Sequence, residues 1–166
     1  MAVSTAVRTY YAERIFALSG RDEAPPNFRA LDVEPTGRFT VEGCRGGGKN
    51  ILEIQLVGEA GRVADLRLAC GLCNPAMYAC SDIVADWARG RSLDEILALD
   101  PLDLPSLAPF FERLGGPGRP DDAREKFQYV LLALQRAALN HRGEAPPTLP
   151  EVPENTGRDL DEDDDD

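Results

Sequence analysis

The chain has 166 residues, of which 43% are hydrophobic, a length and composition that fit one ordinary domain with its own core. Its 18 basic and 29 acidic side chains give a net charge of −11, but the run from Asp159 to Asp166 holds seven of the carboxylates, so the remainder carries only −4. A net-negative body without a cluster of Lys and Arg argues against nucleic acid or an anionic membrane as the main partner.

The start of the chain lacks a basic segment followed by an apolar one, and no apolar stretch reaches the roughly 18 residues that a membrane span needs. We therefore expect a cytoplasmic protein. In that reducing compartment, four cysteines are expected to be thiols available for metal or sulfur chemistry rather than a disulfide framework.

The first half of the chain predicts one helix followed by strands. Apolar residues recur at spacings of three and four from Ser4 to Leu18, which indicates an amphipathic helix, whereas residues 21–36 show no period and are predicted to be a loop. Apolar and polar residues then alternate in short segments, and Gly58–Gly61 closes the last two into a hairpin. The predicted strands are Arg38–Val41, Asn50–Val57 and Val63–Cys70.

The second half predicts helices. Asn74 followed by Pro75 starts one that runs to about Arg89, because Asn accepts from the free amides of the first turn and Pro loses nothing there. Ser92–Glu95 is a capping box that opens a short helix to Leu99. Further helical segments are expected over residues 107–114 and 121–140. One side of the last of these carries Phe127, Val130, Leu131, Leu134 and Ala138.

These elements predict the fold class α+β: a three-stranded antiparallel sheet covered by helices, with an N-terminal amphipathic helix and a long C-terminal helix. Residues 1–142 would form this domain. Residues 143–166 are rich in Pro and acids with few large apolar residues, so they are predicted to form a disordered tail.

A glycine-rich segment, Gly43–Asn50, nearly matches the phosphate-loop pattern GxxxxGK[ST]. Asn50 replaces the hydroxyl residue, and the residues that follow alternate as a strand instead of opening a helix. We interpret the segment as a glycine loop that lets Cys44 move.

The four cysteines, Cys44, Cys70, Cys73 and Cys80, form the pattern C-x25-C-x2-C-x6-C. A C-x2-C step is a common way to deliver two thiolates to one metal ion or cluster. Cys73 directly precedes the predicted helix start, where free amides and the helix dipole favour its thiolate.

Two of these cysteines have an alternative role in the core. Cys70 continues the face of Leu66 and Leu68, and Cys80 lies in a helix near other apolar residues, so either could simply fill space. The single histidine, His141, lies at the predicted end of the last helix, where a cation is favoured, and nothing nearby indicates hydrolase chemistry.

The segment Val63–Glu95 resembles the IscU/NifU/SufU family of iron–sulfur cluster assembly scaffolds. In that family a strand, a glycine-cysteine turn, a helix of small residues and a Gly-Lys-Ser/Thr-Leu-Asp-Glu linker follow one another. The similarity extends over about residues 7–140 and implies a SufE/NifU-like fold.

The resemblance also implies a ligand set. Family members hold a nascent cluster or zinc with three cysteines and an Asp, helped in some groups by a His; Cys44 falls on the first cysteine and Cys73 on the second. The family Asp is replaced by Gly46, and the third cysteine by Phe127, preceded by Lys126. The proline-rich chaperone-recognition motif is absent.

Because those ligands are missing, we hypothesise a relocated site in which all four cysteines bind zinc or a 2Fe–2S or 4Fe–4S cluster. The resemblance then implies a scaffold-like protein, not an enzyme, that receives sulfur from a cysteine desulfurase on Cys44 and passes iron or a cluster to acceptor apo-proteins. The alternatives are a zinc-binding structural or adaptor protein, and an interaction module whose acidic tail binds a basic partner.

Overall fold

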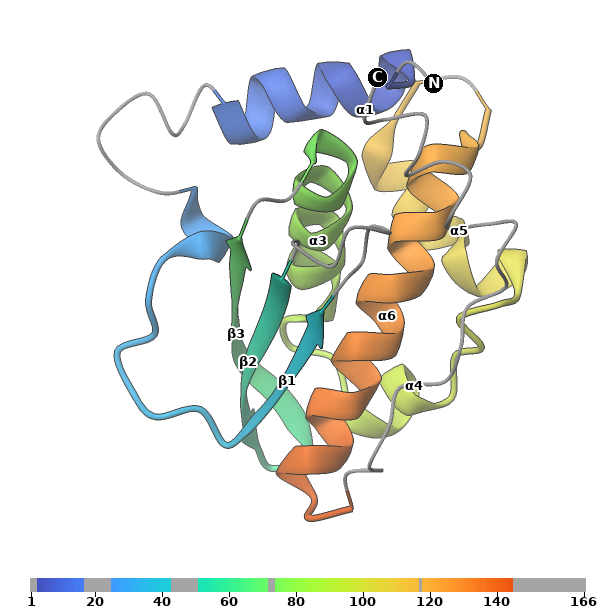
Figure 1. The fold of residues 1–166 in the computed structure, drawn as a ribbon. Coiled ribbons are helices and arrows are strands. Elements are labelled where there is room, and N and C mark those ends of the chain that lie inside the picture. The colour runs from blue at the N-terminus through green and yellow to red at the C-terminus, as the bar shows by residue number, and fades with distance from the viewer. Residues whose placement is uncertain (1–2, 17–24, 43–50, 72–73, 117, 145–166) are drawn as a thin grey trace.

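The computed structural model describes residues 3–16, 25–42, 51–71, 74–116 and 118–144. Its three-stranded sheet comes first in the chain after an N-terminal helix, and further helices follow (Figure 1). The predicted α+β class, with a long C-terminal helix, is confirmed. Among the described residues, no helix is long and apolar enough to cross a membrane.

The sheet is antiparallel in the order β1-β2-β3, with β1 at Gly37–Glu42, β2 at Ile51–Glu59 and β3 at Arg62–Gly71. Period-two alternation places one set of side chains on the core face. Ala60 and Gly61, both with positive φ, form the tight turn between β2 and β3, the geometry that suits the twist of a two-residue hairpin. The buried side chains of the core face include Val41, Leu52, Ile54, Leu56, Val63, Leu66 and Leu68.

Two helices, α3 at Pro75–Ala88 and α6 at Asp121–His141, cover the core face of the sheet. The N-terminal start of α3 matches the prediction, since the Asn74 side chain accepts from the amide of Met77 at 2.8 Å. The predicted apolar side of α6 is fully buried. These helices and the sheet enclose one core. It is extended by an aromatic cluster of Trp87, Phe110, Phe111 and Phe127.

Between α3 and α6 lie α4 at Leu93–Leu97 and α5 at Leu104–Leu114. The predicted cap of α4 is present, because the Ser92 hydroxyl accepts from the amide of Glu95 at 3.0 Å. Helix α5 begins earlier than predicted, with Pro105 in its first turn, where a missing amide hydrogen costs nothing.

The N-terminal helix differs from the regular helix that was predicted over Ser4–Leu18. The α-helical part, α1, covers Thr5–Tyr10 and continues as a π-helical segment, η1, over Tyr11–Phe16. Within η1 the Ile15 side chain is buried. The loop predicted over residues 21–36 contains a short 3-10 turn, η2, at Pro26–Phe28.

Candidate metal and sulfur site

The C-terminal ends of β1 and β3 lie at the same end of the sheet, on either side of the start of β2. Ile51 at the start of β2 pairs with Glu42 on one side and with Gly71 on the other. Because neighbouring strands are about 4.8 Å apart, the backbones of Glu42 and Gly71 are separated by roughly 10 Å. We call this end of the sheet the cysteine edge, since Cys44 and Cys73 each follow two residues beyond it in the sequence.

Three of the predicted site residues fall wholly or partly outside the described part of the chain. Cys44 and Cys73 lie outside the described residues, as does Gly46. The backbone of Cys70 pairs with Leu52 in the β2–β3 register, and its side chain is not among those described. The assignment of Cys44, Cys70 and Cys73 as ligands therefore stays a prediction.

Cys80 lies in α3 with its side chain fully buried against α6. Its Sγ is 3.6 Å from the carbonyl oxygen of Ala123, a distance at which a thiol donates a weak hydrogen bond. Burial raises the pKa of this thiol well above its ordinary value, and the charge of Asp122 adds to the effect while that of Lys126 opposes it. These surroundings favour a neutral thiol, as the core-filling alternative for Cys80 requires.

A buried ion pair lies on α6 beside Cys80. The ammonium of Lys126 is 2.8 Å from the Glu125 carboxylate, and the two side chains are only 1% and 0% exposed. The sequence analysis did not predict this pair. Adjacent residues rarely face the same way on a helix, so no spacing rule indicated it.

This ion pair lies level with the cysteine edge. A Cβ added at Gly37, the start of β1, would meet Ala137 and His141 of α6, and the amide of Arg38 donates to the Asn140 side chain at 3.0 Å. Helix α6 runs opposite to β1 from there (Figure 1). From Ala137, eleven helical residues back to Lys126 cover about 16 Å. From Gly37, five strand residues on to Glu42 cover about the same distance, 16 Å, so Lys126 lies at the height of Glu42.

The residue that stands where the resemblance expects the third cysteine offers no metal ligand. Phe127 is fully buried, and its ring centroid lies 5.4 Å from that of Phe110 and 5.1 Å from that of Phe111. Within the described ranges, no group of three His, Cys, Asp or Glu side chains could hold a metal ion. The family-like ligand set is therefore not completed from α6, and ligands would have to come from the cysteine edge.

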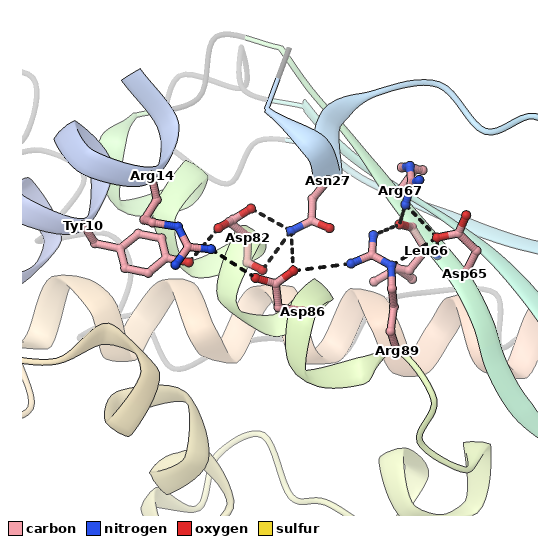
Figure 2. A network of polar contacts seen from close by, with 9 residues as sticks. All are labelled: Tyr10, Arg14, Asn27, Asp65, Leu66, Arg67, Asp82, Asp86 and Arg89. Atoms are coloured by element: carbon pink, nitrogen blue, oxygen red, sulfur yellow. Dashed lines mark hydrogen bonds and ion pairs between the residues drawn. The ribbon is translucent and has the colours of Figure 1, made fainter. Parts of the chain in front are cut away.

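A polar network that sequence reasoning missed joins the N-terminal region to α3 and β3 (Figure 2). The Tyr10 hydroxyl donates to Asp82 at 2.6 Å, and the Asn27 amide donates to Asp82 at 2.7 Å and to Asp86 at 3.0 Å. Arg89 continues the network from Asp86 at 3.4 Å to Asp65 at 3.1 Å. Because its partners are up to 72 residues apart, no local motif could reveal it.

Burial dominates the titration of this network. It raises the pKa of Asp82 above the ordinary carboxyl value, although the hydrogen bonds from Tyr10 and Asn27 act in the opposite direction. Burial and the hydrogen bond to Asp82 raise the pKa of Tyr10 as well, so it stays a neutral donor. The network fixes α1, η1 and η2 on the outer side of α3, the helix that begins at the cysteine edge.

His141 lies at the opposite end of the sheet. Its Nδ1 is 2.8 Å from the Thr36 hydroxyl, which also accepts from the amide of Gly58 at 2.8 Å. The predicted position at the end of α6 is confirmed. The imidazole joins α6 to the β1–β2 end of the sheet and is far from the cysteine edge, so its role there is structural.

Comparison with known proteins supports the fold. No family model and no curated protein sequence matches the chain. Among solved structures, the N-terminal part of a nitrogen-fixing NifU-like protein from Brucella abortus matches with a TM-score of 0.50 and 17% identity, over 86% of this chain and 95% of that one. At that identity, the likeness establishes a NifU-like fold and nothing finer.

Proposed function

We propose that this chain is an iron–sulfur cluster assembly scaffold-like protein, which binds iron or a nascent cluster through cysteines at the cysteine edge and passes it to acceptor proteins. The observation that carries the proposal is the shared edge: Glu42 and Gly71 flank Ile51, and Cys44 and Cys73 each lie two residues further along the chain. Two residues extend by up to about 7 Å, so both thiols can reach one ion or cluster across the gap.

The NifU-like fold adds to this argument. It is a fold in which a protein described as NifU-like is known, and the cysteines of this chain fall where the sequence resemblance expects the first two ligands. Cys73 also directly precedes the capped N-terminus of α3, where the helix dipole favours a thiolate.

We assign Cys44, Cys70 and Cys73 to binding and Cys80 to the core. The fully buried thiol of Cys80 has a raised pKa, so making it a ligand would require a charged sulfur to form in the interior. Three thiolates leave one position of a tetrahedral ion open, which suits a cargo that must be handed on. This assignment replaces the hypothesis of four cysteine ligands with one of three: Cys44, Cys70 and Cys73.

Sulfur delivery follows from thiol exchange. The Cys44 thiolate attacks the outer sulfur of a persulfide on a cysteine desulfurase, and a new sulfur–sulfur bond forms on Cys44. The original bond breaks, and the desulfurase cysteine leaves as a thiolate, so no external oxidant is needed. Cys73 and Cys70 would then hold iron beside the persulfide, and two electrons from an external thiol or electron-transfer protein would convert the outer sulfur into the sulfide of a cluster.

Metal analysis of protein purified under anaerobic conditions tests this function. We expect iron and acid-labile sulfide in similar amounts and a visible charge-transfer spectrum, and we expect transfer of the cluster to a small apo-protein with four cysteine ligands. Zinc without sulfide would overturn the scaffold function and assign the zinc-binding structural role. Protein that binds neither metal would contradict both.

A further inference from the structure

A mostly apolar groove of about 490 Å³ lies at the far end of α6 from the cysteine edge, between that helix and the α4–α5 connection. Leu132 and Leu139 line it from α6, and Leu97 and Leu102 line it from the opposite side. Leu102 is 50% exposed, so part of the apolar lining faces solvent. Apolar surface of this kind usually marks a place where another segment binds.

The groove is held open by hydrogen bonds to the backbone. The Gln135 side chain, on α6, donates to the carbonyl oxygens of Ile96 at 3.0 Å and of Leu99 at 2.8 Å. These bonds fix the α4–α5 connection at a set distance from α6. The groove is therefore formed without any occupant, since these hydrogen bonds connect its two sides.

The chain leaves α6 directly beside this groove. Gly143 has a φ of 77°, and the amide of Glu144 donates to the carbonyl oxygen of Leu139 at 2.8 Å. This is the ending that glycine permits at a helix C-terminus, and it terminates α6 beside the groove. The last described residue is thus bonded to a residue that lines the groove.

We propose that part of the chain's own C-terminal segment occupies this groove. The part is residues 145–153, Ala-Pro-Pro-Thr-Leu-Pro-Glu-Val-Pro, and Leu149 would lie between Leu132 and Leu102. The segment is long enough to reach this position. A polyproline stretch from Glu144 to Leu149 covers about 16 Å, whereas the groove side of α6 from Leu139 back to Leu132 covers only about 10 Å.

Charge and entropy favour this occupant. Arg136 lies at the rim, has no ion pair within the described part of the chain, and comes within range of Glu151 when the segment lies along α6. Four prolines restrict the free segment, so less freedom is lost on docking, and the covalent link supplies a high effective concentration. A segment that cannot fold alone can still order on a formed surface. The prediction of a disordered tail then applies to residues 154–166.

Photo-crosslinking of the full chain tests the docking. Leu149→benzoylphenylalanine should give crosslinks within one chain to residues 97–102 or 132–139, whereas the matched control Thr156→benzoylphenylalanine should give none there. Crosslinks that join two chains would identify a second copy as the occupant and overturn the proposal. The absence of groove crosslinks at Leu149 would overturn it too.

Hydrogen exchange on protein without benzoylphenylalanine provides a second measurement, which needs no bulky probe in the groove. Leu149→Asp should speed amide exchange around residues 102–104 about tenfold, because a buried leucine contributes about that factor to a local equilibrium. Thr156→Asp should leave the rates unchanged. Equal rates in wild type and Leu149→Asp would contradict docking. Neither measurement depends on the cysteines, so failure here leaves the proposed function intact.

Discussion

At the scale of single residues, the buried pair Glu125–Lys126 offers the sharpest test of how α6 is stabilised. Lys126→Met leaves the Glu125 carboxylate in the core without its nearest cation, 2.8 Å away in the wild type. Removing one partner of a buried pair typically costs about 3 kcal/mol, so we expect a clear shift to lower urea in unfolding curves. The double variant Glu125→Gln/Lys126→Met should recover most of that loss. A single variant as stable as wild type would contradict the role of the pair.

Asp82 predicts a pH dependence of stability. Because burial raises its pKa, the folded state holds this proton more tightly than the unfolded chain does. The stabilisation is fully present below the ordinary carboxyl pKa of about 4, and it is lost as pH rises through the raised pKa of the folded state. Asp82→Asn stays neutral, so its stability relative to wild type should increase over this window.

Tyr10→Phe serves as the partner variant for Asp82. It removes the hydrogen bond that lowers the Asp82 pKa, so the loss of stability should move to higher pH. Denaturant unfolding at a series of pH values measures both variants. A stability difference between Asp82→Asn and wild type that is flat with pH would show that Asp82 titrates normally.

At the scale of elements, the close contact between β2 and α6 depends on the absence of a side chain at Gly58. A Cβ at Gly58 would lie 2.6 Å from two atoms of the His141 ring. Because these atoms are the far end of a side chain that can turn away, Gly58→Ala should destabilise the protein by about 1 kcal/mol, mainly through loss of the hydrogen bond between the ring and Thr36. In a His141→Ala background the same change should cost much less, and thermal unfolding of the four proteins gives the coupling. Equal costs in both backgrounds would mean that the ring does not set this spacing.

The elements also show how far local sequence carries. The strands and α3, α4 and α6 were predicted to within a few residues, because alternation, caps and apolar stripes are local properties. The π-helical turn of η1 was not predicted, since its residues keep a helical period. Helix α5 begins at Leu104 instead of near residue 107, with Pro105 in its first turn, where proline is accepted although it lacks an amide hydrogen.

At the scale of the whole molecule, the fold could be predicted but the polar interior of the site could not. The resemblance led to the NifU-like fold, whereas its assignment of Cys44 and Cys73 as ligands stays a prediction, since both lie outside the described residues. The buried Glu125–Lys126 pair and the Tyr10–Asp82–Asn27 network depend on contacts between elements distant in sequence, which no spacing reveals. The environment of Cys80 was one of two alternatives that the sequence left open, and only packing against Ala123 favours the core role.

The most direct test of the account is anaerobic reconstitution with iron and sulfide of four proteins: wild type, Cys44→Ser, Cys73→Ser and the matched control Cys80→Ala. Bound iron, acid-labile sulfide and the visible spectrum are measured for each. We predict near-equal iron and sulfide on wild type and on Cys80→Ala, and loss of both from the two serine variants. The same cluster on all four proteins, or its loss from Cys80→Ala alone, would contradict a site at the cysteine edge.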